Sequence, residues 1–128
     1  MDDGLHWVDA HRIAVLHVAG RQVMKASVER VALAIEAAAD DGAKGMVVDL
    51  RDIEGIDPPD LGTRHIIVRR WAEAARSRLC LAMVVRPEFL DPEKFAVVAA
   101  ANFGLVANAF ETRTDALDWL RHEIPPPV

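Results

Sequence analysis

Residues 46–62, MVVDLRDIEGIDPPDLG, join a short apolar strand to the start of a helix. Residues 46–50 are too few and too rich in β-branched side chains for a helix, and they predict a buried strand. The run that follows holds two carboxylates around a pair of prolines. Asp57 can cap the free amide groups of a helix, Pro58 suits the first helical position, and Asp60 is favourable in the positive first turn. This order of strand and helix predicts an α/β protein.

The chain before this segment changes from a strand pattern to a helix pattern. Residues 5–8 and 13–18 are short apolar or alternating runs, and they predict a hairpin with a four-residue connection. From residue 26 apolar side chains recur at three- and four-residue spacing, which predicts a helix over residues 26–41. Gly42 follows at the position where the end of a helix favours a left-handed residue.

The chain after this segment alternates strands and helices. The helix opened by the prolines should continue to about Arg76. The later elements are a strand over residues 79–85, a helix opened by Asp91 and Pro92 that ends near Asn102, a strand over residues 106–110, and a helix capped by Thr112 with Asp115. We expect a single α/β domain over residues 1–123, with a mixed, mostly parallel sheet of about five strands and about four helices. Residues 124–128 are expected to form a flexible tail.

The composition limits the classes of protein to which the chain can belong. Its 128 residues are enough for one ordinary core, and a formal net charge of −5 argues against a general nucleic-acid binder. No apolar run approaches the about 20 residues that cross a bilayer, and the first residues lack a basic, apolar leader. The single cysteine, Cys80, excludes an intramolecular disulfide. We expect a cytoplasmic protein without membrane contact.

Acidic side chains gather at the end of the central strand and in the loop after it: Asp49, Asp52, Glu54, Asp57 and Asp60. Ligands of open α/β sheets usually bind at the carboxyl ends of the strands, so these acids are candidates for a metal or acid–base site. The alternative is a helix cap, a first-turn acid and solvated loop charges. No histidine lies in the cluster, and its spacing differs from that of a calcium loop. We therefore expect no metal, no cofactor and no catalytic residue.

Residues 46–62 resemble the signature of STAS domains, the sulfate transporter and anti-sigma factor antagonist family. In that signature an apolar strand ends in Asp-Leu, and an apolar-Asp-Ser-Ser/Thr-Gly-Leu-Gly run then opens a helix. The matching residues here are Asp49-Leu50, Ile56-Asp57 and Leu61-Gly62. The order of elements agrees over residues 5–122, and the run FETRTDALDWL resembles the family's final helix. The resemblance implies a small, stand-alone bacterial protein with a STAS-like fold.

Two positions of the signature differ in a way that matters for regulation. In antagonists of anti-sigma factors, a serine of the Asp-Ser-Ser-Gly turn is phosphorylated by the partner kinase. Pro58 and Pro59 stand at the two matching positions, and neither has a hydroxyl group. The nearest hydroxyl belongs to Thr63, a turn into the predicted helix. The resemblance thus implies a regulatory module that has lost this phosphorylation site.

A protein partner, if the resemblance extends to binding, contacts the loop and the helix after it. The candidate residues are Asp52, Glu54, Asp57, Asp60, Thr63, Arg69 and Arg70. They place both signs of charge within a short span, which favours specificity and fast encounter. We expect a non-catalytic interaction module whose partner is a kinase-like or other regulatory protein, with self-association as a further option.

The same helix is rich in basic side chains: Arg64, His65, Arg69, Arg70, Arg76 and Arg78. They could bind a phosphate or an acidic partner, or they could form the solvated face of an amphipathic helix. We favour the solvated face. Its buried side then consists of Leu61, Val68, Ala72 and Ala75.

A second function from a different class is a carrier of a small apolar ligand, either a lipid or a nucleotide. The apolar pocket of such a carrier would be lined by Phe89, Phe95, Phe103 and Phe110. A pocket of this kind typically measures several hundred Å³. Its presence or absence distinguishes the carrier from the interaction module.

Overall fold

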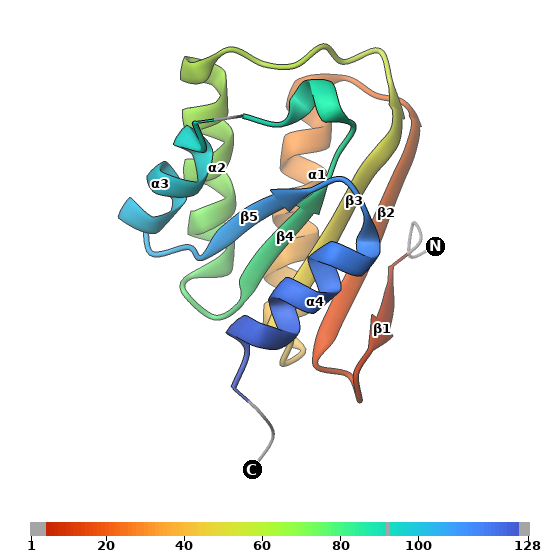
Figure 1. Cartoon of the computed structure of the whole chain (residues 1–128), viewed down its shortest axis with the longest axis vertical. Helices are drawn as coiled ribbons and strands as arrows, with labels where there is room; N and C mark the ends of the chain where they lie inside the picture. Colours follow the sequence, from red (N-terminus) through yellow and green to blue (C-terminus); the bar gives the residue numbers. More distant parts are fainter. Residues whose placement is uncertain (1–4, 92, 126–128) are drawn as a thin grey trace.

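The computed structural model describes residues 5–91 and 93–125. Within these residues a five-stranded sheet lies at the centre, and its strands follow one another across the sheet in sequence order (Figure 1). The strands are β1 (His6–Val8), β2 (Ile13–Arg21), β3 (Gly45–Glu54), β4 (Cys80–Val84) and β5 (Ala107–Phe110). β1 pairs antiparallel with β2, and every other neighbouring pair is parallel.

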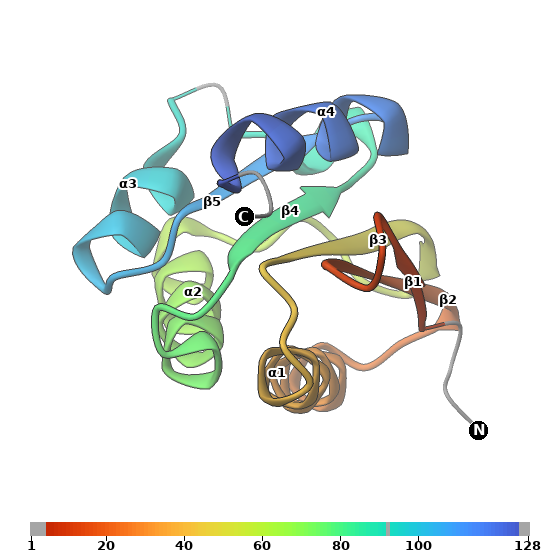
Figure 2. The same ribbon diagram turned by 90° about the horizontal axis from the view of Figure 1, so that it is seen from below.

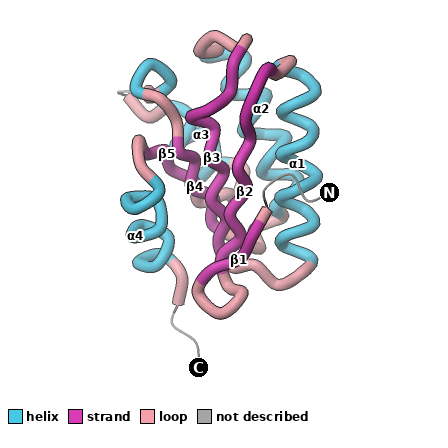
Figure 3. The backbone as a smooth tube through the Cα atoms, turned by 90° about the vertical axis from the view of Figure 1, so that its right-hand side faces the viewer, coloured by secondary structure: helices cyan, strands magenta, loops and turns pink. Residues whose placement is uncertain are grey.

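The helices of the described residues form a layer on each side of the sheet. They are α1 (Met24–Asp40), α2 (Leu61–Ala75), α3 (Phe95–Asn102) and α4 (Arg113–Glu123), with a short 3-10 turn at Pro87–Phe89. α1 and α2 cover one face and α4 covers the other (Figures 2 and 3). The α/β class, the mixed, mostly parallel sheet and the expected numbers of strands and helices are confirmed.

Apolar side chains fill both faces of the sheet. The larger cluster packs α1, α2 and α3 against the sheet, and it includes the fully buried Ile35 and Met46. The smaller cluster lies under α4 and includes Val47 and Leu120. Ile124, the first residue of the expected tail, is buried in this second cluster. Because β3 and β4 are covered on both faces, their apolar runs are nearly continuous.

β3 is longer than the strand expected over residues 46–50. It runs from Gly45 to Glu54, because its last residues pair with the end of β2 beyond an irregularity between His17 and Ala19. The charged residues after position 50 gave no local strand signal. Pairing with a neighbouring strand supplies the stability that local propensity lacks.

α2 begins later than the sequence predicts, and the assignment of its cap to Asp57 is wrong. The N-cap is Asp60, whose side chain accepts a hydrogen bond from the Thr63 amide at 2.8 Å. Pro58 lies in the preceding loop and is not the first helical residue. A residue before proline disfavours the helical conformation, so Pro58 cannot readily start a helix in front of Pro59.

The caps of the last two helices differ in how well the sequence predicts them. Asp91 accepts hydrogen bonds from the amides of Glu93 and Phe95, but α3 begins only at Phe95. The expected start at Pro92 lies outside the described residues. The end of α3 at Asn102 is confirmed, as is the cap of α4, where Thr112 accepts from the Asp115 amide at 3.1 Å. None of the described helices is long and apolar enough to span a bilayer.

Candidate functional site

The residues expected to contact a partner lie along the end of β3, the loop after it and α2. Asp52 and Glu54 are among the last residues of β3, Asp57 belongs to the loop, and Asp60 caps α2. Thr63, Arg69 and Arg70 follow on the helix itself. The order of charge along this path is therefore acidic at the loop and basic further along the helix.

Three of these residues are engaged within the protein. The Asp52 carboxylate lies 2.7 Å from Nε2 of His17 on β2. Arg70 donates two hydrogen bonds to Glu29 of α1, at 2.6 and 3.0 Å, and these bonds lower the pKa of the Glu29 carboxyl. Asp60 is used as the helix cap. Within the described part of the chain, the side chains of Glu54, Asp57 and Arg69 make no hydrogen bond or ion pair, so among the expected contact residues they are the charged groups free for a partner.

Three of the six basic side chains between Arg64 and Arg78 pair with acids of α1. Besides the pair between Arg70 and Glu29, the Asp40 carboxylate at the end of α1 receives a 2.5 Å hydrogen bond from Arg78 and lies 3.9 Å from Arg76. These contacts agree with a solvated helix face whose charges are compensated by acids nearby. They leave Arg69 as a basic group on the outer side of α2.

Two large apolar side chains at the start of α2 face solvent. Leu61 is 56% exposed and Ile66 is 68% exposed. The prediction that Leu61 belongs to the buried side of α2 is wrong, whereas Val68, Ala72 and Ala75 are buried as predicted. Leu61 is the first helical residue, directly after the cap.

Ile66 is a functional candidate that the sequence interpretation missed. It lies out of step with the buried stripe of α2, which is a signal that the spacing alone could have given. Because Arg69 follows one turn later on the same exposed side, charged and apolar groups adjoin. We call these residues the α2-start surface, defined by Asp57, Asp60, Leu61, Ile66 and Arg69; Leu61 and Ile66, five residues apart, lie about 140° apart around the helix and offer two separate apolar contacts.

The contacts of the buried Asp49 carboxylate are those of a structural group that joins β3 to α4. Only 1% exposed, it accepts hydrogen bonds from the side chains of Arg51 (3.0 and 2.8 Å) and Arg113 (2.7 Å) and from the Arg51 amide (3.1 Å). Burial raises the pKa of this carboxyl, but the hydrogen bonds outweigh burial and hold the pKa at about 2. A carboxylate whose oxygens already accept hydrogen bonds from two arginines, and whose pKa is this low, is a poor general base.

The other reactive groups do not form a site either. Burial, with a smaller effect of Glu123, raises the pKa of the Cys80 thiol, which disfavours the nucleophilic thiolate. The acids of the loop do not come together: no group of three or more histidine, cysteine or acidic side chains among the described residues could hold a metal ion.

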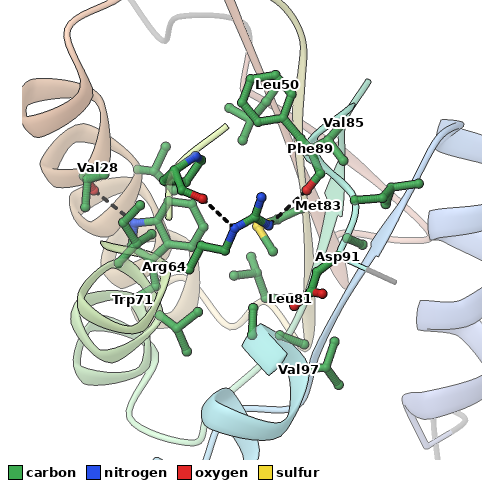
Figure 4. Close-up of a pocket in the computed structure, with 18 of the residues that line it drawn as sticks. Val28, Leu50, Arg64, Trp71, Leu81, Met83, Val85, Phe89, Asp91 and Val97 are labelled. Carbon is green, nitrogen blue, oxygen red and sulfur yellow. Dashed lines mark hydrogen bonds between the residues drawn. The ribbon is translucent and has the colours of Figure 1, made fainter. Parts of the chain in front are cut away.

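A cavity of about 170 Å³ lies between the sheet and helices α1, α2 and α3. Its walls are mostly apolar and include Val28, Leu81 and Val97, with Arg64 among them (Figure 4). The volume is below the range of about 300–1,000 Å³ that is usual for sites of drug-sized ligands. This volume therefore gives no support to the lipid or nucleotide carrier considered from the sequence.

The phenylalanines expected to line a pocket are dispersed in the structure. Phe89 lines the cavity. Phe95 is half exposed at the start of α3, and Phe103 contacts the ring of His65 at 5.3 Å. Phe110 packs on the opposite face of the sheet against Trp119, at 5.6 Å between ring centroids. The prediction of a pocket lined by all four is therefore wrong, because residues of one type on different elements need not face one another.

Comparisons with known proteins give a similarity of fold. No family model matches the sequence, and no curated protein matches it. Among solved structures, the anti-sigma factor antagonist SpoIIAA in its unphosphorylated form is similar to this chain. The match covers 94% of this chain and 97% of that chain, with 18% sequence identity and a TM-score of 0.48.

Proposed function

We propose that this protein is a non-catalytic regulatory module that binds a protein partner through the α2-start surface. The observation that supports this proposal is the exposure of Leu61 and Ile66 among charged side chains. Protein interfaces commonly have an apolar centre and a polar rim, and exposed apolar side chains gain most from being covered. Asp57 and Arg69 supply charges of opposite sign for the rim.

The chemistry of the surface defines the partner. Apolar side chains of the partner would cover Leu61 and Ile66, a basic group would face Asp57 and Asp60, and an acidic group would face Arg69. The resemblance of residues 46–62 to the STAS signature favours a kinase-like or other regulatory protein. Because Pro58 and Pro59 lack hydroxyl groups, we propose that the partner binds without a phosphate switch at these positions.

Affinity capture from an extract of the source cells tests this function. The immobilised baits are the unchanged protein, Leu61→Asp, Ile66→Asp and, as a control, Leu33→Asp. Leu33 is 55% exposed on α1, which matches the exposure of Leu61. The same partner should be captured by the unchanged protein and by the control, and lost by the other two. Equal capture by all four baits would contradict the proposal.

A further inference from the structure

Arg64 of α2 lies at the edge of the cavity and is fixed there by two separate segments. Its Nε donates a hydrogen bond to the Pro59 carbonyl at 2.8 Å, and its Nη1 donates to the Phe89 carbonyl at 3.0 Å (Figure 4). A guanidinium has five N–H groups, so three of those of Arg64 have no partner among the described residues. The half-buried side chain is therefore held in place while part of its hydrogen-bonding capacity stays unused.

The charges around the cavity favour an anion. Its charged lining residues are Arg64, Lys94 and Asp91, whose formal charges sum to +1. The Asp91 carboxylate is occupied, since its oxygens accept from the amides of Glu93 at 3.0 Å and Phe95 at 2.8 Å. A planar carboxylate can accept two N–H groups of one guanidinium, and such charge-assisted bonds are stronger than neutral ones.

The remaining walls favour an apolar body. Leu50, Met83, Val85 and Val97 present hydrocarbon or thioether groups (Figure 4). The indole of Trp71 also lines the cavity, but its N–H donates to the Val28 carbonyl at 3.0 Å and is not available to a ligand. An occupant thus gains from burying apolar surface while its acidic group contacts Arg64.

The volume limits the size of this occupant. An apolar cavity of about 150 Å³ holds benzene, and the cavity here is about 170 Å³. We propose that the cavity binds a small carboxylate with a compact apolar body of about the size of a benzene ring, and that Arg64 holds the carboxylate. This binding function lies beyond partner binding and does not depend on it, because no residue of the α2-start surface lines the cavity.

Titration of the full chain, followed by backbone amide chemical shifts in NMR spectra, tests the proposal. The probe is phenylacetate, and the comparison ligands are benzyl alcohol, acetate and hexadecanoate. Phenylacetate should bind saturably, with shifts centred on Arg64 and Met83, and at least tenfold more tightly than benzyl alcohol or acetate. No saturable binding, equal affinity for benzyl alcohol, or tighter binding of hexadecanoate would overturn the proposal.

Variants identify the contacts responsible. Arg64→Gln should remove the preference for phenylacetate over benzyl alcohol, whereas Arg69→Gln, on the exposed side of the same helix, should leave it unchanged. Val97→Phe should weaken binding of both ligands at least tenfold by filling the cavity, and it keeps the test decisive if Arg64→Gln does not fold. Unchanged phenylacetate binding by folded Arg64→Gln or by Val97→Phe would exclude this site.

Discussion

The carboxylate of Asp49 and the guanidinium of Arg113 are joined by a 2.7 Å hydrogen bond across 64 positions of sequence. Asp49 lies inside β3, and Arg113 is the first residue of α4. The bond fixes the start of the helix to the sheet on the face opposite α1 and α2. Arg51 also donates to this carboxylate. Removal of the Asp49 carboxylate would therefore leave the guanidinium groups of Arg51 and Arg113 without their acceptor.

Asp49 should make the stability of the protein sensitive to acid. Its pKa is lowered from 3.8 to about 2, so its contribution is complete above pH 4 and is lost as the pH falls through about 2. A shift of this size corresponds to about 2 kcal/mol of unfolding free energy. Asp49→Asn should therefore be about 2 kcal/mol less stable in urea unfolding at pH 7. That difference should shrink between pH 4 and pH 2, and a difference independent of pH would contradict this role.

The two acids that flank the proline pair should have different effects on stability. Asp60→Ala removes the side chain that caps α2 and should lower the melting temperature by roughly 4 °C. Asp57→Ala removes an exposed loop charge that has no partner among the described residues, and it should leave the melting temperature nearly unchanged. Thermal unfolding followed by circular dichroism compares the two variants. A larger loss of melting temperature in Asp57→Ala than in Asp60→Ala would show that Asp57, and not Asp60, caps α2.

Phosphorylation should not occur in the loop before α2. Residues 57–62 contain no serine, threonine or tyrosine, so a serine kinase of the anti-sigma type should leave them unmodified. Mass spectrometry of the protein after incubation with such a kinase measures the outcome. Phosphate at Thr63, the nearest hydroxyl, would show that a displaced switch exists.

The order of strands and helices could be predicted from local sequence, because the signals act over a few residues. The buried stripe of α1 and the cap formed by Thr112 and Asp115 are examples. The position of the α2 cap depends on one further local rule: both Asp57 and Asp60 satisfy the cap pattern, and the disfavoured helical conformation before Pro59 decides between them. The extension of β3 depends on pairing with β2, which no local pattern shows.

The candidate sites depended still more on tertiary structure. The sequence identified the charged residues near the start of α2, but it could not show that Arg70 is paired with Glu29 or that Leu61 is exposed. The contact of Arg64 with the Phe89 carbonyl joins residues 25 positions apart and arises only when α2 packs beside the segment after β4. The cavity follows from the same packing.

The dissociation constant of the purified partner, measured by titration calorimetry with three forms of this protein, tests the proposed interface most directly. Leu61→Asp places a carboxylate in the first turn of α2, where a negative charge is favourable, so the helix should be retained. This variant should raise the dissociation constant at least tenfold relative to the unchanged protein, while Leu33→Asp should change it less than twofold. Equal dissociation constants for Leu61→Asp and the unchanged protein would contradict an interface at the α2-start surface.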